Sequence, residues 1–97
     1  MAKAYAIAMI EVTNLEGMGP YFENVGETIA AHGGRYLVKH MGENLYTEND
    51  PKPLTVILEF PDKEAVMAWK TSTEYQKTVS FRLDNSNGPL VLCEGLD

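Results

Sequence analysis

The sequence predicts an α+β domain whose elements follow one another as strand, helix, strand, strand, helix, strand. Three observations predict it. Residues 3–12 alternate with a period of two, residues 54–60 form a β-branched apolar run that stops at Pro61, and residues 20–32 and 62–70 space their apolar side chains as helices do. With 97 residues, 44% of them hydrophobic, residues 1–97 make one domain with one core.

The first half of the chain supplies two strands and a helix. Along residues 3–12, one side carries small or aliphatic residues and the other a mixed set: Ala4, Ala6, Ala8, Ile10 and Val12 against Tyr5, Ile7, Met9 and Glu11. We expect a loop at 13–19 and a helix that opens at Pro20, because proline suits a first helical turn. Gly33 and Gly34 end that helix. Residues 35–41 form the second strand.

The second half repeats the pattern with an added helix. After the polar connection 42–53 and the strand 54–60, Asp62 caps a helix that places Ala65, Val66 and Trp69 on one face. Thr71 or Ser72 caps a further short helix with a stripe made of Tyr75, Val79 and Leu83. Turn residues occupy 84–89, and residues 90–94 form the last strand.

This order is the ferredoxin-like βαββαβ unit, a four-stranded antiparallel sheet of order 4-1-3-2 with helices on one face. If the alanine side and Val56, Leu58 and Phe60 meet the helices, the open face is apolar, with Tyr5, Ile7, Met9, Leu37, Ile57, Leu90 and Leu92. Such a patch is too large for a stable monomer. The sequence therefore predicts a homodimer whose open faces pack together.

Charge and composition exclude several classes of partner. Fourteen acidic and eight basic residues give a net charge of −6, which disfavours nucleic acid and anionic lipid. The longest apolar run, residues 4–10, is too short to span a membrane or to serve as a signal peptide, so we expect a cytoplasmic protein. His32, His40 and Cys93 have no metal-ligand spacing, and no nucleotide-binding glycine motif is present. We expect neither a metal nor a cofactor.

Arg35 and Glu59 are the candidate catalytic residues. Antiparallel pairing sets Arg35 opposite Glu59, Leu37 opposite Ile57 and Lys39 opposite Thr55, all on the open face. In a closed cavity, Arg35 would hold a carboxylate or enolate while Glu59 moves a proton. The alternative is an interfacial salt bridge. The candidate ligand-binding residues are those expected around the pair on that face: Tyr5, Met9, Leu37, Ile57 and Glu94.

Two further side chains have a structural and a functional interpretation. Trp69, together with Tyr75, would form an aromatic wall for a ligand, but its helical spacing favours core packing. His32 ends a helix, where its charged form would interact with the helix dipole. Cys93 lies in an apolar strand pattern and is expected to act as a small hydrophobic residue.

Three segments resemble a known family: GGRYLV at 33–38, LEFPDKEAVMAW at 58–69 and STEYQ at 72–76. They are similar to the bacterial domain-of-unknown-function family thirteen-thirty, within the dimeric α/β-barrel superfamily, and the similarity covers nearly the whole chain. The resemblance implies a homodimer whose sheets close into a barrel around a central cavity. It implies no assigned reaction. Relatives by fold include cofactor-independent oxygenases, isomerases and dehalogenases, and members without any chemistry.

The sequence thus leaves two functions open. The first is a small-molecule-binding dimer that acts as a cofactor-independent enzyme, of the oxygenase or isomerase type, on an acidic or aromatic metabolite. The second is a non-catalytic binding or accessory protein of the same architecture. The two differ in whether Arg35 and Glu59 face a void or face each other.

Overall fold

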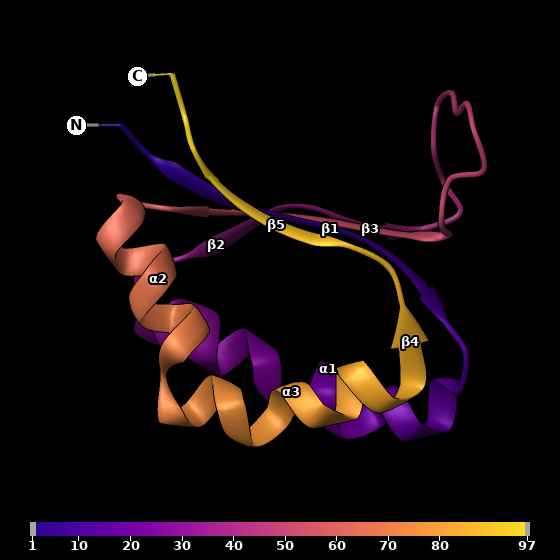
Figure 1. Cartoon of the computed structure of the whole chain (residues 1–97), viewed down its shortest axis with the longest axis horizontal. Coiled ribbons are helices and arrows are strands. Elements are labelled where there is room, and N and C mark those ends of the chain that lie inside the picture. The colour runs from indigo at the N-terminus through magenta and orange to yellow at the C-terminus, as the bar shows by residue number, and fades with distance from the viewer. Residues whose placement is uncertain (1, 97) are drawn as a thin grey trace.

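The computed structural model describes residues 2–96 and contains one antiparallel sheet with helices on one face only (Figure 1). The long strands are β1 (Ala4–Val12), β2 (Arg35–Met41), β3 (Leu54–Phe60) and β5 (Leu90–Glu94). The helices are α1 (Leu15–Ala31), α2 (Lys63–Thr71) and α3 (Thr73–Asn85). None of these helices combines the length and the apolar character needed to cross a membrane.

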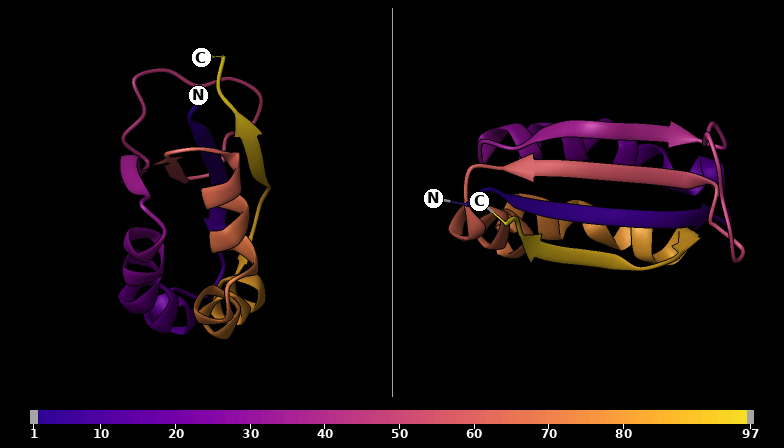
Figure 2. Two further views of the ribbon diagram at one scale, coloured as in Figure 1. Left: turned by 90° about the vertical axis from the view of Figure 1, so that its left-hand side faces the viewer. Right: turned by 90° about the horizontal axis from the view of Figure 1, so that it is seen from above.

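β1 is central in the sheet, as the view onto the strands in Figure 2 shows. It pairs with β3 on one side and with β5 on the other, and β3 also pairs with β2. The order β2-β3-β1-β5 is the predicted order read from the opposite edge, so the ferredoxin-like fold is confirmed. A short strand that we did not predict, β4 (Ser86–Asn87), pairs with β1 ahead of β5.

Gly88 allows the chain to pass from β4 to β5. Its φ is +142°, and a Cβ at this position would overlap the backbone carbonyl of Met9. Only glycine tolerates both conditions, because it has no side chain. Next to Gly88, the Met9 amide donates a hydrogen bond to the Pro89 carbonyl at 3.3 Å. This bond holds the link between β4 and β5 close to β1.

The core lies between the sheet and the helices. The alanines of β1 are at most 8% exposed, and their small side chains let the helices approach the sheet. The Trp69 ring packs 4.3 Å from the Tyr75 ring and 5.3 Å from the Phe60 ring, measured between centroids. Its indole Nε1 donates to Thr28 Oγ1 at 3.0 Å. Trp69 is therefore a core residue, as predicted.

Side-chain caps fix the helix starts. Asp62 accepts a hydrogen bond from the Ala65 amide at 2.8 Å, which confirms the predicted cap of α2. Ser72 accepts one from the Tyr75 amide at 3.1 Å, so of the two predicted alternatives, Thr71 and Ser72, it is Ser72 that caps α3. The predicted start of α1 at Pro20 is wrong, because Asn14 caps the helix and α1 begins at Leu15. Burial of Met18, which is 0% exposed, anchors this first turn despite its glycines.

A β-bulge in β2 changes the predicted pairing with β3. Arg35 pairs with Glu59 as predicted, but the register shifts between Tyr36 and Val38, so that Val38 pairs with Ile57. The predicted pairs of Leu37 with Ile57 and of Lys39 with Thr55 are wrong, since Leu37 has no partner and Lys39 pairs with Val56. One extra residue moves every later side chain of the strand to the other face.

The faces of β5 and α3 also differ from the prediction. Leu90 and Leu92 pair with Ala8 and Ala6 and lie on the helix-covered side, whereas Val91 and Cys93 share the open face with Ile7 and Tyr5. The predicted alternation of side chains along β5 was correct, but we assigned the two sets of side chains to the wrong faces of the sheet. In α3 the predicted Leu83 is 62% exposed, and the buried stripe consists of Tyr75, Thr78, Val79 and Arg82. Cys93 is exposed, so it is not the buried hydrophobic residue that we expected.

Candidate functional site

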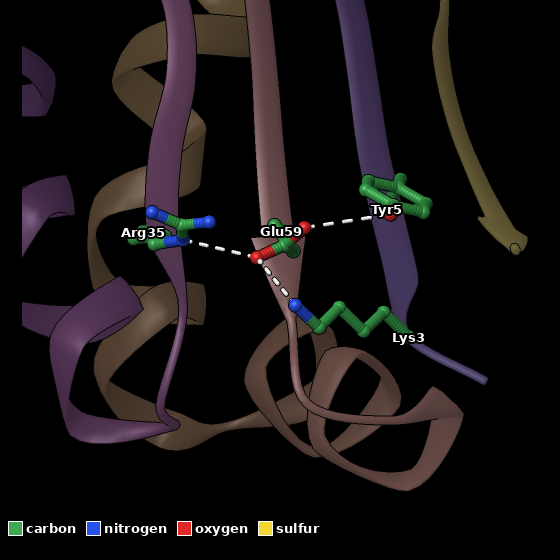
Figure 3. Close-up of polar contacts among 4 residues, drawn as sticks. All are labelled: Lys3, Tyr5, Arg35 and Glu59. Carbon is green, nitrogen blue, oxygen red and sulfur yellow. Dashed lines mark hydrogen bonds and ion pairs between the residues drawn. The ribbon is translucent and has the colours of Figure 1, made fainter. Parts of the chain in front are cut away.

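Glu59 is the centre of a polar cluster on the open face of the sheet (Figure 3). The Arg35 Nε donates to Glu59 Oε1 at 2.9 Å, and Lys3 Nζ lies 3.6 Å from the same oxygen. The Tyr5 hydroxyl donates to the other carboxylate oxygen at 3.4 Å. The Glu59 side chain is 13% exposed, against 67% for Arg35 and 56% for Lys3. A sheltered carboxylate is therefore surrounded by more exposed cations.

The hydrogen bond from Arg35 lowers the pKa of the Glu59 carboxyl, because it stabilises the charged form. The charges of Arg35 and Lys3 lower this pKa further, and partial burial opposes them. Glu59 is thus ionised at neutral pH and is a weaker base than a free carboxylate. Arg35 and Lys3 both contact Oε1, so Oε2, which has only the long hydrogen bond from Tyr5, is the oxygen open to a further proton donor.

Three of the five predicted ligand-binding residues lie on the open face, namely Tyr5, Met9 and Ile57. Ile57 pairs with Ile7, Ile7 pairs with Val91, and Val38 pairs with Ile57, which makes an apolar row across the four long strands.

The other two candidates are placed elsewhere. Leu37 sits in the bulge with 43% exposure, and Glu94 pairs with Ala4, on the helix-covered side. Since facing partners in a ladder share a side of the sheet, Glu94 cannot join Glu59.

A cavity of about 50 Å³ between the sheet and the helices is a second candidate site, which we did not predict from the sequence. Aromatic rings form much of its wall: Tyr21, Phe22, Tyr36, Trp69 and Tyr75. Its charged lining residues are Lys39 and Arg82, and no acidic residue of the described chain lines it. Lys39 reaches this side of the sheet because of the bulge, and its Nζ lies 5.0 Å from the centre of the Tyr36 ring.

Arg82 is the most unusual residue of this cavity, because its charged side chain is only 7% exposed. Its Nη2 donates to the Tyr75 hydroxyl at 3.5 Å, and its guanidinium carbon lies 5.9 Å from the centre of the Tyr21 ring. Its buried Nε has no hydrogen-bond partner within residues 2–96. The ion pairs of this part of the chain involve Lys3, Arg35 and Lys52 instead.

The phenol of Tyr21 stays neutral beside this charge. Burial is the main cause that raises the pKa of Tyr21, and the nearby Tyr75 adds to it, while the positive Arg82 acts in the opposite direction. A protonated Tyr21 hydroxyl can donate a hydrogen bond at any physiological pH. The cavity therefore offers hydrogen-bond donors in apolar surroundings, without a carboxylate acceptor on its described lining.

The sequence contains a signal for Arg82 that we did not use. Tyr75, Thr78, Val79 and Arg82 follow the spacing i, i+3, i+4 and i+7, which is one face of a helix. We extended the stripe from Val79 to the apolar Leu83 and so passed over its charged neighbour. An arginine in a buried stripe is the feature to look for, since such a residue needs a partner.

Metal-binding side chains do not gather in the described part of the chain, where no three of His, Cys, Asp and Glu lie close enough to share an ion. At the end of α1, the His32 Nδ1–H donates a hydrogen bond to the Thr28 carbonyl at 2.9 Å.

Solved structures share this fold at low sequence identity. The methylated RPA0582 protein of Rhodopseudomonas palustris has a TM-score of 0.79 at 13% identity, with 99% of this chain and 82% of that chain covered. A dimeric ferredoxin-like protein of unknown function from Jannaschia sp. CCS1 has a TM-score of 0.67 at 14% identity, over 98% and 99% of the two chains. SnoaB, a cofactor-independent oxygenase from Streptomyces nogalater, has a TM-score of 0.68 at 11% identity, over 100% and 96%.

Such identities show the fold and nothing of the activity. No curated protein matches the sequence. The family profile described as Domain of unknown function (DUF1330) matches residues 3–96, which include every strand and helix of the fold, the Glu59 cluster and the cavity. The chain therefore belongs to the DUF1330 family.

Proposed function

We propose that the protein binds a small organic molecule in the cavity between its sheet and its helices. The observation that carries this proposal is the cavity itself, where buried Arg82 and several aromatic rings surround unfilled space. Ligand sites in proteins are typically apolar hollows with a few well-placed polar groups, and this cavity has that composition. The fold supports the proposal, since SnoaB, a cofactor-independent oxygenase, shares it.

The protein acts as a homodimer joined through the open faces of its sheets. The apolar row that crosses the sheet supports this, because it leaves Ile7 38% and Val91 51% exposed on the face without helices. Related folds from Jannaschia sp. CCS1 and Thermobifida fusca are described as dimeric. Sheet packing of this kind would also shelter the Glu59 cluster at the edge of the contact.

The Glu59 cluster lies on the opposite face of the sheet from the cavity, so it concerns a ligand held between the two sheets rather than the molecule in the cavity. In the binding protein, Arg35 and Glu59 form a structural ion pair, which their 2.9 Å contact supports. In a cofactor-independent enzyme of the oxygenase or isomerase type, a ligand between the two sheets would bind to Arg35, and Glu59 would then transfer a proton to or from that ligand. The exposure of Arg35, whose side chain is 67% accessible, supports this second candidate, because it leaves donors free for a ligand anion beside Glu59.

In the enzyme, Tyr5, Met9 and Ile57 would contact the ligand directly, and Leu37 would do so from the bulge. Glu94 lies on the helix-covered side of the edge strand β5, so it would not contact this ligand directly. The variant Glu59→Gln separates the two candidates, because it removes the base and leaves the cavity unchanged. Binding without turnover in both wild type and variant would identify a binding protein.

A cytoplasmic location is part of this proposal. Cys93 is exposed and unpaired. Reducing compartments preserve exposed free thiols, whereas secreted proteins of this size usually pair them.

The binding proposal is tested by filling the cavity. In Ala8→Leu, a larger side chain enters the cavity from β1, and Ala68→Leu makes the same change on the exposed face of α2. Native mass spectrometry on untagged protein purified from cells should show bound small molecules for wild type and Ala68→Leu and lose them for Ala8→Leu. Circular dichroism must show both variants folded, since overpacking costs about 1–3 kcal/mol. Equal ligand occupancy in all three proteins would exclude the cavity as the site.

A further inference from the structure

Within residues 2–96, no carboxylate forms an ion pair with Arg82. The side chain lines the cavity and is 7% exposed, so water reaches little of it. Its hydrogen bond to the Tyr75 hydroxyl is 3.5 Å long, and the Tyr21 ring is 5.9 Å away, which makes both interactions weak. Buried polar groups are almost always hydrogen-bonded, so the free Nε requires an explanation.

The lining of the cavity is positive in an acidic protein. The chain has fourteen acidic residues and a net charge of −6, yet the described lining contains Lys39 and Arg82 and no carboxylate. On the other face, by contrast, Arg35 has Glu59 as a partner at 2.9 Å. The cavity thus keeps its cation available for an anion from outside the chain.

We propose that Arg82 binds the carboxylate of a monoanionic aromatic acid, whose ring lies at the β2 edge of the cavity, beside Tyr36. Nε and Nη2 of an arginine lie on one edge of the guanidinium, and this edge matches the two oxygens of a carboxylate. In Arg82, Nε is free and Nη2 has only the long bond to Tyr75. This inference rests on the proposed ligand cavity and adds the charge and the class of the ligand.

The size of the cavity indicates where the ligand enters. About 50 Å³ admits a carboxylate but not a ring, since typical ligand pockets measure roughly 300–1,000 Å³. Tyr36 and Lys39 are the lining residues classed as exposed, and both lie on the edge strand β2 beside the bulge. Both side chains lie at the surface, so moving them outward would break their contact with each other rather than contacts among the fully buried residues. The ring therefore enters at this edge, and Lys39 adds a second positive charge at the entrance.

The test compares benzoate with benzyl alcohol, a neutral molecule of similar shape. Isothermal titration calorimetry is run on wild type, on Arg82→Met and on Lys77→Met, which removes one positive charge from the exposed side of the same helix. We expect Arg82→Met to bind benzoate at least about tenfold more weakly, the loss of one charge-assisted contact, and Lys77→Met to match wild type within about twofold. Affinity for benzyl alcohol should be equal in all three proteins.

Three results would overturn the inference, and they differ in what they leave intact. If wild type binds both probes equally and Arg82→Met changes neither, the cavity binds small molecules without using the charge, and only the anion site is refuted. If Lys77→Met loses benzoate as Arg82→Met does, the effect is one of net charge. If wild type binds neither probe, this inference fails, and the comparison of Ala8→Leu with Ala68→Leu decides separately whether the cavity holds another ligand.

A second measurement keeps the test decisive if Arg82→Met does not fold. In wild type, the nuclear magnetic resonance signal of the Arg82 Nε–H should shift when benzoate is added and stay in place with benzyl alcohol. Arg82→Lys keeps the charge but lacks the two-donor edge, so it should retain only part of the preference for benzoate. An Nε–H signal that benzoate does not move would refute the contact.

Discussion

Replacing Ile57 by aspartate tests the proposed dimer at its centre. Ile57 lies in the middle of the sheet, paired with Ile7 on one side and Val38 on the other, on the face that carries no helix. The substitution changes no core contact of the protomer, because the helices lie on the opposite side of the sheet (Figure 1). Its effect should therefore fall on association.

The expected loss of dimer affinity is estimated from two quantities: the apolar side-chain surface that remains exposed on the open face, and the cost of burying the new carboxylate. Complete burial of an Ile or Val side chain contributes about 1.5–3 kcal/mol, so covering the 38% of Ile7 and 51% of Val91 that remain exposed adds roughly 0.6–1.5 kcal/mol each. An unpaired carboxylate in the same contact costs at least about 2 kcal/mol, and the symmetry of a homodimer doubles this to about 4 kcal/mol. The dissociation constant should rise by roughly a thousandfold.

Sedimentation velocity at low micromolar protein measures the outcome. We expect a dimer for wild type and a monomer for Ile57→Asp. Leu83→Asp is the matched control, since it makes a similar change on α3, where Leu83 is 62% exposed, and it should remain a dimer. A stable dimer of Ile57→Asp, or a monomeric wild type, would refute the open-face interface.

Three further predictions concern stability. Trp69→Ala should lower the free energy of unfolding by about 3–5 kcal/mol through the cavity it leaves, and a loss below about 1 kcal/mol in chemical denaturation would contradict the core role of Trp69. Asp62→Ala should cost about 1 kcal/mol by removing the cap of α2, whereas Asp62→Asn should cost less, because asparagine also accepts the amide bond. The lowered pKa of Glu59 means that its ion pair stabilises the fold above the ordinary carboxyl pKa and is lost as pH falls through the lowered one. Glu59→Gln should remove that acid-side part of the pH dependence of unfolding, and an unchanged profile would show that the pair adds no stability.

The sequence predicted those features that depend on local chemistry. Asp62 and Ser72 could be recognised as candidate caps because a side-chain oxygen just before an amphipathic helix can accept a hydrogen bond from the free amides of the first turn. The pairing of Arg35 with Glu59 was found because it lies at the start of β2, before the bulge shifts the register. The register beyond the bulge was not predicted. Nothing in the residues around Leu37 marks a bulge, and its exposure is a consequence of the shift rather than a cause.

The cavity was missed for a related reason. Its lining combines residues from both halves of the chain, and Lys39 joins it only because the bulge turns it from the open face to the helix-covered one. Arg82 occupies a stripe position that hydrophobic spacing alone assigns to an apolar residue. A buried charge without a partner is visible only when the neighbours are known, so this part of the site had to come from the structure.

The alternation of β1 makes the two proposed sites independent of each other. Its even-numbered residues, such as Ala6 and Ala8, form a wall of the cavity, whereas Ile7 and Met9 point to the open face. A substitution at one position therefore changes either the ligand cavity or the contact between sheets, with no shared side chain. Ile57→Asp should thus yield a monomer that retains its cavity, and Ala8→Leu should yield a dimer with the cavity filled. If the monomer lost benzoate binding, residues of a second copy would be needed to complete the site, and the ligand would lie closer to the Glu59 cluster than to Arg82.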